Sequence, residues 1–315
     1  MQWFTQAPAN IALIKYMGKK DTESNLPANP SLSYTLDNLV SSVVLESYMG
    51  KKDLWEPLEI PGAATFELSS SGQQRFLRHL TRIKDYFRYT GSFIVRSTNN
   101  FPHSSGLASS ASSFAALTKC ASLAISELTS QPLPSIEEQA KLSMRGSGSS
   151  CRSFFSPWAL WQEDKVESIP LAYTQLYHQV IVISHTEKQV SSSEAHQRVK
   201  TSNQYAARAH RATENLKVLL DAFRTKDWAS AYQICWREFH DMHNLFNSSV
   251  PPFHYMTEKS KEVLNTLKDL WHRAGDGPIV TMDAGPNIHL LYRMDQVEQA
   301  LQFKQDYLVG NYDVL

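Results

Sequence analysis

Three loops rich in small residues carry the side chains that could do chemistry in this chain of 315 residues. The first runs from Pro102 to Ser112 and leads into the start of an expected helix. The first N–H groups of a helix lack intrahelical partners and carry partial positive charge, so small residues let the backbone approach an anion. Serine hydroxyls add donors or a Mg²⁺ ligand. The pattern indicates a phosphate-binding loop or, alternatively, serine capping with close packing of small residues.

The second loop runs from Arg145 to Arg152 and combines glycine and serine with two guanidinium groups. Arginine presents a planar fork that suits a carboxylate or a phosphate. This loop is therefore either an anion site or a helix C-cap followed by a linker.

The third loop, Asp283 to Asn287, lies between two expected strands. Its Asp, Gly and Pro are ordinary turn residues, but a carboxylate on a rigid turn also suits a general base.

Other candidates carry weaker signals. Lys15 and Lys19 follow the first apolar segment and can meet anionic groups of a ligand, although most lysines are solvated surface. His240 and His243 have a spacing that suits a metal, but the sequence offers no second ligand pair, so core or surface histidines are the alternative. Cys151 lies beside two arginines that lower a thiol pKa, yet no base for it is identifiable.

Periodicity predicts the elements that hold these loops. Helices are expected at 73–89, 111–125, 136–145, 191–223, 227–247 and 257–274, and strands at 32–39, 41–46, 92–97, 180–183, 278–282 and 289–292. The strand-rich first part gives way to helix-rich sequence near residue 185. We therefore expect an α+β protein with an N-terminal domain at 1–185 and a C-terminal domain at 186–315.

Composition narrows the class of protein. Hydrophobic residues make up 42% and charged residues 20%, which is enough for a buried core and argues against disorder. The formal net charge is zero, which argues against a nucleic-acid partner. No signal peptide is recognisable and no window approaches the ~20 apolar residues of a membrane span. With only 3 cysteines, far apart in the sequence, we expect a cytoplasmic protein with no membrane partner and no disulfide scaffold.

The loops together resemble motifs of the GHMP kinase superfamily. Pro102-His-Ser-Ser-Gly-Leu-Ala-Ser-Ser-Ala111 resembles its ATP-binding motif, Pro-x-x-x-Gly-Leu-x-Ser-Ser-Ala. Within the superfamily, residues 7–21, 25–29, 145–152 and 282–287 resemble the mevalonate diphosphate decarboxylase family. The resemblance implies the GHMP kinase fold, with an N-terminal α/β domain (ribosomal protein S5 domain 2-like), a C-terminal ferredoxin-like domain and the active site between them.

The resemblance also implies a reaction, the ATP-dependent decarboxylation of (R)-5-diphosphomevalonate to isopentenyl diphosphate, ADP, phosphate and CO₂ in the mevalonate pathway of isoprenoid biosynthesis. Asp283 matches the aspartate that orients or deprotonates the C3 hydroxyl, and Lys15 matches the lysine beside it. Arg152 matches the arginine that holds the C1 carboxylate, and Ser110 matches a serine that reaches the phosphates. These four residues are the expected catalytic set.

The remaining expected roles follow the same matches. ATP and Mg²⁺ are the implied cofactors, with Mg²⁺ held mainly by ATP and Ser110 as the one candidate protein ligand. A homodimer is implied as well. The expected substrate-binding residues are Tyr16, Met17, Gly18, Lys19, Ser147, Gly148, Ser149, Arg152, Ser192 and Ser193. The expected nucleotide-binding residues are Ser97, Asn100, Ser105, Gly106, Leu107, Ala108, Ser109 and Ser110.

Three departures from the family pattern stand out. Met17 occupies a position where the family often has tryptophan, and Ser156-Pro157 replaces a common Gly-Gly pair. Gly72 lies opposite a basic residue of the family, which leaves Arg75 as its nearest substitute.

Related enzymes that act on mevalonate 5-phosphate, or that phosphorylate the C3 hydroxyl without decarboxylation, remain alternatives, as does a non-catalytic sensor. The presence of all the expected catalytic residues favours the decarboxylase.

Overall fold

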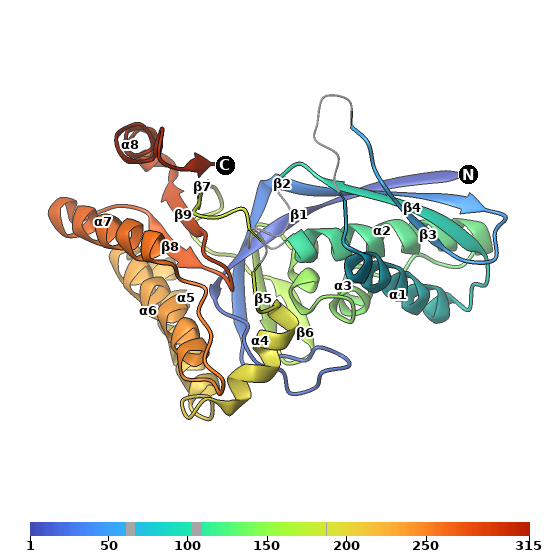
Figure 1. Ribbon diagram of the computed structural model, residues 1–315, viewed down its shortest axis with the longest axis horizontal. Coiled ribbons are helices and arrows are strands. Elements are labelled where there is room, and N and C mark those ends of the chain that lie inside the picture. Colours follow the sequence, from blue (N-terminus) through green and yellow to red (C-terminus); the bar gives the residue numbers. More distant parts are fainter. Residues whose placement is uncertain (61–66, 102–108, 187) are drawn as a thin grey trace.

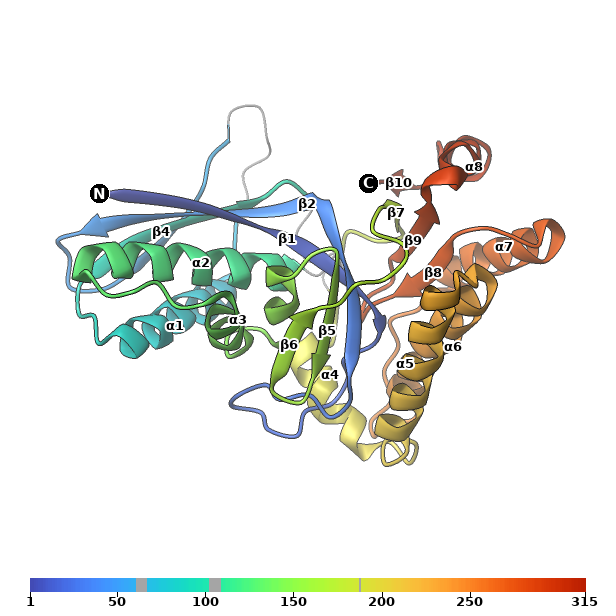
Figure 2. The same cartoon turned by 180° about the vertical axis from the view of Figure 1, so that it is seen from behind.

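The structure, a computed structural model, describes residues 1–60, 67–101, 109–186 and 188–315. Within these ranges the chain forms two β-sheets, each covered by helices, and Figures 1 and 2 show the two halves side by side. All strands of the first sheet precede those of the second in the chain. Helices and largely antiparallel strands are thus both present, as expected of an α+β protein. No helix in the described part of the chain is long and apolar enough to cross a membrane.

A long central strand organises the first sheet. The sheet contains β1 (Gln2–Ile14), β2 (Ser31–Tyr48), β3 (Leu54–Pro57), β4 (Ser92–Asn99), β5 (Trp158–Gln162) and β6 (Lys165–Ser168). β2 pairs with β5 near its start and with β4 near its end, while β1 runs antiparallel beside it. The sequence predicts two strands where the structure has the single β2. A register shift between Pro8 and Ala9 interrupts the ladder because proline has no N–H to donate.

Helices cover one face of this sheet (Figure 1). They are α1 (Ser70–Phe87), α2 (Ser109–Thr129) and α3 (Ile136–Met144), followed by the 3₁₀ helix η1 (Gly148–Phe154). α1 begins at the cap residue Ser69, whose hydroxyl accepts a hydrogen bond of 3.2 Å from the N–H of Gly72. Its apolar side packs Phe76 and Leu80 against α2 and the sheet. The three helices that periodicity predicts in this region are confirmed.

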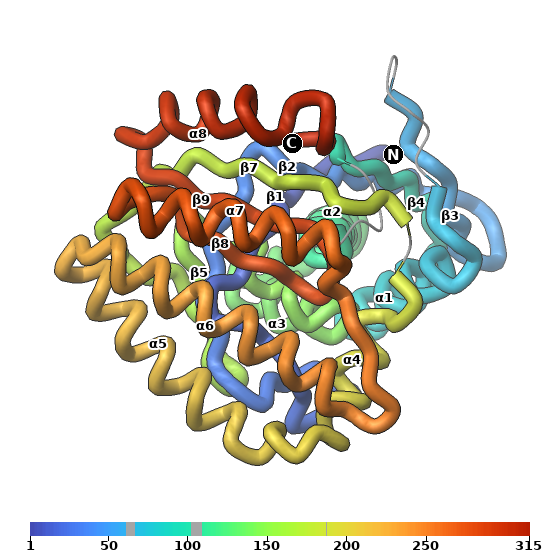
Figure 3. The backbone as a smooth tube through the Cα atoms, turned by 60° about the vertical axis from the view of Figure 1, so that its left-hand side comes forward, coloured from blue at the N-terminus to red at the C-terminus, as the bar shows by residue number. Residues whose placement is uncertain are grey.

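The second sheet has the antiparallel order β10-β7-β9-β8. Its strands are β7 (Leu176–Val182), β8 (Ile279–Met282), β9 (Ile288–Arg293) and β10 (Asp313–Val314). The helices of this half are α4 (Ser192–Arg198), η2 (Val199–Thr201), α5 (Arg208–Thr225), α6 (Trp228–Asn247), α7 (Glu258–Ala274), η3 (Met294–Gln296), α8 (Val297–Phe303) and the π turn η4 (Lys304–Leu308). Figure 3 shows α5, α6 and α7 running alongside one another. The predicted hairpin of β8 and β9 is confirmed.

The expectation of one continuous helix over 191–223 is wrong. The chain leaves the helical path between η2 and α5, where Ser202 accepts a hydrogen bond of 3.1 Å from the N–H of Gln204. Serine competes in this way with the helical ladder. The break places Tyr205 against Gly18, which adopts φ of +90° and has no room for a Cβ beside that ring. The irregular segment therefore contacts the turn that follows β1.

A shared core joins the two halves. Leu13, Tyr34 and Trp158 of the first half belong to one buried cluster with Val180 and Phe223 of the second. The chain changes sheet between β6 and β7, upstream of residue 185, because β7 pairs with β9 and β10. The strand expected at 180–183 therefore lies with the C-terminal elements.

Candidate active site

The end of β1 brings a buried lysine to the turn after β8. The Nζ of Lys15 lies 2.7 Å from Oδ1 of Asp283, and the lysine side chain is only 1% exposed. Burial lowers the pKa of Lys15 although Asp283 opposes it. Burial alone would raise the pKa of Asp283, but the Lys15 ammonium and other cations outweigh it and lower that pKa. Asp283 is therefore an ionised, weakly basic carboxylate beside a cation.

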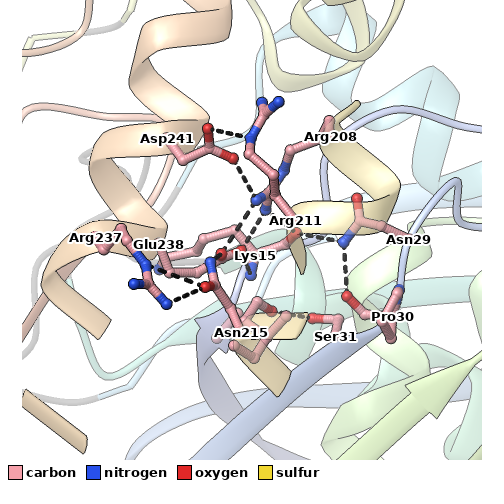
Figure 4. Close-up of polar contacts among 12 residues, drawn as sticks. Lys15, Asn29, Pro30, Ser31, Arg208, Arg211, Asn215, Arg237, Glu238 and Asp241 are labelled. Atoms are coloured by element: carbon pink, nitrogen blue, oxygen red, sulfur yellow. Dashed lines mark hydrogen bonds and ion pairs between the residues drawn. The ribbon is translucent and has the colours of Figure 1, made fainter. Parts of the chain in front are cut away.

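A network of buried charges holds the backbone of Lys15 from behind (Figure 4). Glu238 on α6 accepts a hydrogen bond of 3.0 Å from the Lys15 N–H, and Arg208 on α5 donates one of 3.0 Å to the Lys15 carbonyl. Arg208 also pairs with Glu238 and, at 2.7 Å, with Asp241. Asn29 donates to the same carbonyl at 2.9 Å. Residues of the second half of the chain thus bind both the main chain of Lys15, through Glu238 and Arg208, and its side chain, through Asp283.

Arg152 is a buried cation whose partners are neutral. Its Nε donates to Oδ1 of Asn10 at 3.1 Å, and its Nη1 donates to the Ser31 hydroxyl at 2.8 Å. The guanidinium carbon lies 5.9 Å from the centre of the Trp161 ring. Among the described residues no carboxylate lies within ion-pair distance of Arg152, although the residue is 4% exposed and lines a cavity. Such an arrangement favours the binding of an anionic group from a ligand.

The turn after β1 carries the other substrate-site candidates of the N-terminus. The Tyr16 hydroxyl donates to the carbonyl of Asn25 at 3.1 Å, and the Tyr16 ring packs between Trp161 and His196. Lys19 Nζ donates to Oδ1 of Asn25 at 2.5 Å. The N–H of Gly18 points instead to Nδ1 of His196, at 3.0 Å. Tyr16, Met17 and Lys19 line the cavity, and Gly18 shapes the turn between them.

The serine loops of the two expected subsites meet at the start of α2. The hydroxyls of Ser147 and Ser110 lie 3.3 Å apart. Ser97 lines the same cavity and accepts a hydrogen bond of 2.9 Å from the Trp55 indole. Asn100 does not line it, because its side-chain amide is hydrogen-bonded to the backbone of Asn38 and Val40 in β2. Ser105, Gly106, Leu107 and Ala108 lie outside the described residues, so their role stays a prediction.

These elements enclose one cavity of about 410 Å³. It receives side chains from both halves of the chain. The expected residues that line it are Lys15, Tyr16, Met17, Lys19, Ser97, Ser109, Ser110, Ser147, Gly148, Ser149, Arg152, Ser192, Ser193 and Asp283. The sequence motifs thus converge on one place.

The cavity also contains residues that the motifs did not single out. Lys188 is half-buried there, and its Nζ donates to the Ala284 carbonyl at 2.8 Å and to the Ser192 hydroxyl at 3.0 Å. Burial lowers its pKa, although Asp283 opposes this shift. A lone lysine just before a helix N-cap gives no motif signal. Its only sequence indication is its place four residues before Ser192.

The donor set fits a Mg²⁺ ion held chiefly by a nucleotide. Among the described residues there is no group of three or more His, Cys, Asp and Glu side chains that could hold a metal. The cavity does offer hard oxygen donors in the Ser110 hydroxyl and the Asp283 carboxylate. His243 is buried and directs Nε2 to the Asp283 carbonyl at 3.1 Å, which accounts for it without a metal. Burial raises the pKa of Cys151 to about 12, so a thiolate nucleophile is disfavoured.

Comparisons with known proteins agree with this geometry. A family described as the diphosphomevalonate decarboxylase-like N-terminal domain matches residues 7–172, and the mevalonate 5-diphosphate decarboxylase C-terminal domain matches residues 179–314. The diphosphomevalonate decarboxylase of Saccharomyces cerevisiae is 31% identical over 326 residues, which cover 94% of this chain and 79% of the relative.

Solved structures are similar over the whole chain. A mevalonate diphosphate decarboxylase from Legionella pneumophila is 65% identical, with a TM-score of 0.95 and 100% coverage of both chains. A structure described as MDDEF in complex with MVAPP, AMPPCP and magnesium is 29% identical, with a TM-score of 0.87, and the match covers 100% of this chain and 96% of that one. These matches confirm the α+β fold and the family that the motifs predict. The chain belongs to the diphosphomevalonate decarboxylase family.

Proposed function

We propose that this chain uses ATP and Mg²⁺ to decarboxylate mevalonate 5-diphosphate, with Asp283, Lys15 and Arg152 as the catalytic residues. The observation that carries these assignments is the convergence of a paired lysine and aspartate with an arginine that has no carboxylate partner among the described residues, all on one cavity. Asp283 and Lys15 supply the carboxylate and the cation that phosphorylation of a hydroxyl group needs. Arg152 supplies a second cation, which suits the carboxylate of the substrate that leaves as CO₂.

Asp283 orients the C3 hydroxyl more than it deprotonates it. A general base works best when its pKa lies near the working pH, and the pKa of Asp283 is lowered instead. The tertiary hydroxyl therefore loses its proton to Asp283 only as its oxygen bonds to the γ-phosphorus of ATP. Lys15 offsets the negative charge that develops there. The salt bridge of 2.7 Å fixes the positions of Lys15 and Asp283 relative to each other.

Arg152 holds the carboxylate in the geometry that decarboxylation needs. When the new C3 phosphate leaves with the electrons of its C–O bond, C3 becomes electron-deficient. The electron pair of the C1–C2 bond then forms the C2–C3 double bond, and CO₂ departs. The buried hydrogen bonds of Arg152 to Asn10 and Ser31 fix its guanidinium plane before the substrate binds.

The nucleotide binds near the start of α2 in this proposal. Ser109 and Ser110 lie in its first turn, and Ser97 lines the same side of the cavity. Ser110 would be the ligand that the chain offers to Mg²⁺, and the ion would neutralise charge on adjacent ATP phosphates. A related structure holds MVAPP, AMPPCP and magnesium together, which supports ATP and Mg²⁺ as the cofactors. Lys188 adds a third cation that borders both the Asp283 loop and α4.

The test measures ADP and CO₂ in parallel with Mg²⁺-ATP and mevalonate, its 5-phosphate or its 5-diphosphate. Equal yields of both products with the diphosphate alone are expected. Asp283→Asn should retain ATP binding and lose turnover by about three orders of magnitude or more. ADP without CO₂ would identify a C3-hydroxyl kinase and contradict the role of Arg152. No turnover with any substrate would favour the non-catalytic sensor.

We also propose the wider context of the enzyme. Three free, buried thiols suit a reducing cytoplasmic location. The two sheets support a division into two domains, with the boundary between β6 and β7. The family resemblance favours a homodimer, which size-exclusion chromatography with light scattering tests.

A further inference from the structure

A second cavity, of about 310 Å³, adjoins the active site. Cations dominate its lining, because Arg78, Arg82 and Arg145 face it while Glu23 is its one carboxylate. The two cavities share the following residues: Lys19, Asn25, Arg75, Gly146 and Ser193. A ligand in the second cavity would therefore touch the border of the first.

Neutral partners hold three of the cations of this cavity, Lys19, Arg75 and Arg82. The Arg75 guanidinium lies 5.5 Å from the centre of the Phe114 ring. Nη1 of Arg82 donates to the carbonyl of Arg145 at 2.5 Å. Across the described part of the chain, no ion pair involves Lys19 or any of the four arginines that line this cavity. These three side chains are therefore positioned, while the positive charge of the five cations is not compensated by an ion pair within the described residues.

The arrangement brings like charges close together on the helix that borders the cavity. Arg75, Arg78 and Arg82 lie three and four residues apart on α1, so they share one face of the helix and repel one another. Burial and then the positive charge of Arg75 lower the pKa of Lys19. An anion in the cavity would remove this repulsion. Five cations surround a space large enough for a phosphorylated group.

We propose that this arginine-lined cavity is a vestibule that captures the diphosphate group of the substrate and passes it to Lys19 and Arg75 at the border of the active site. The inference rests on the proposed function, since it takes a diphosphate ester as the ligand. Clefts lined by one sign of charge raise association rates by about 10- to 1000-fold, and salt weakens the effect. Because Lys19 and Arg75 border both cavities, the diphosphate stays in contact with cations along the whole path.

The first experiment measures the affinity of inorganic pyrophosphate by calorimetry at low and high salt. The double variant Arg78→Gln/Arg82→Gln should bind it about tenfold more weakly at low salt, with a flatter salt dependence. The matched control is Lys268→Gln/Arg273→Gln, which removes two positive charges from the exposed surface of α7. The control should bind pyrophosphate within about twofold of the unsubstituted protein. Equal binding by all three proteins would overturn the proposal.

The second experiment links the cavity to catalysis. The Arg78→Gln/Arg82→Gln variant should keep its kcat and its KM for ATP, while kcat/KM for the diphosphate substrate falls about tenfold at low salt. An unchanged kcat/KM would overturn the vestibule even if pyrophosphate binding were weaker. Pyrophosphate binding can be measured without turnover, so the vestibule can be tested separately from the decarboxylase function. An inactive protein whose pyrophosphate affinity still depends on these arginines would contradict the decarboxylase and support the anion site.

Discussion

Replacing Glu238 with glutamine tests what holds Lys15 in place. Glu238 is 0% exposed, and its carboxylate binds the Lys15 N–H, Arg208 and the amide of Asn215. Glutamine keeps the shape of the side chain but removes its charge. It also presents an N–H₂ group where Glu238 only accepts hydrogen bonds. We expect the variant to lose stability and turnover together.

The expected loss of stability follows from the burial of the pair. Removing one partner of a buried ion pair costs about 3–5 kcal/mol, because the other charge stays buried without it. Arg208 keeps Asp241 at 2.7 Å, so the low end, about 3 kcal/mol, applies here. For domains of about 150–250 residues each kcal/mol lowers Tm by about 2–4 °C, which predicts a fall of about 6–12 °C. A displacement of Lys15 by about 1 Å would lower kcat by about 100-fold.

Thermal unfolding and steady-state kinetics measure both effects. The matched control is Glu258→Gln, which breaks an exposed pair with Lys261 on α7 and should leave Tm and kcat nearly unchanged. A Glu238→Gln variant with Tm within about 2 °C of the unsubstituted protein and an unchanged kcat would refute the reasoning. A fall in Tm with unchanged kcat would leave the ion pair as a stabilising feature that does not position Lys15.

Three further predictions concern buried groups near the site. Burial lowers the pKa of His79 and His243 to about 3, so below about pH 6.5 the unfolded chain binds protons that the folded chain does not. Stability should therefore fall from pH 7 to pH 5 in equilibrium denaturation, and a constant value would contradict this. Gly148→Ala should raise the KM for mevalonate diphosphate and leave that for ATP unchanged, because a Cβ would lie 2.7 Å from the Tyr16 hydroxyl; an unchanged KM would show that Tyr16 tolerates the displacement. Burial raises the pKa of Cys151 to about 12, so DTNB should react with the cysteines only after denaturation, and rapid reaction of the native protein would contradict their burial.

Sequence reasoning located most of the site because its residues lie in short loops with distinctive composition. Lys15, Arg152 and Asp283 belong to three separate motifs, yet the structure places all three on one cavity. Periodicity also located α1 and α7, whose apolar faces are regular. Both results rest on local patterns, which a sequence shows directly.

The residues that sequence reasoning missed act over long distances. Glu238 lies 223 positions from Lys15, and its neighbour on the same helix, Arg237, is exposed. A charged residue in a helix is ordinarily exposed, so nothing in the sequence distinguishes a buried one. The break before α5 was missed for a related reason. Tyr205 leaves the helix to pack on Gly18, a contact that helical periodicity does not register.

Two electrostatic arrangements meet at Lys15 and Lys19, only four residues apart in the sequence. Lys15 pairs with Asp283, and behind it Arg208 pairs with Glu238 and Asp241. These paired charges keep the geometry of this part of the site whether or not a ligand is present. Around Lys19 no carboxylate among the described residues pairs with the cations, so a bound anion would relieve their repulsion. The substrate diphosphate would supply that charge, whereas the C3 hydroxyl would supply none. The cations around Lys19 therefore supply binding energy through the diphosphate. The paired Lys15 and Asp283 act instead on the reacting C3 oxygen. Catalysis by differential binding requires such a separation between groups that bind the substrate and groups that stabilise the transition state.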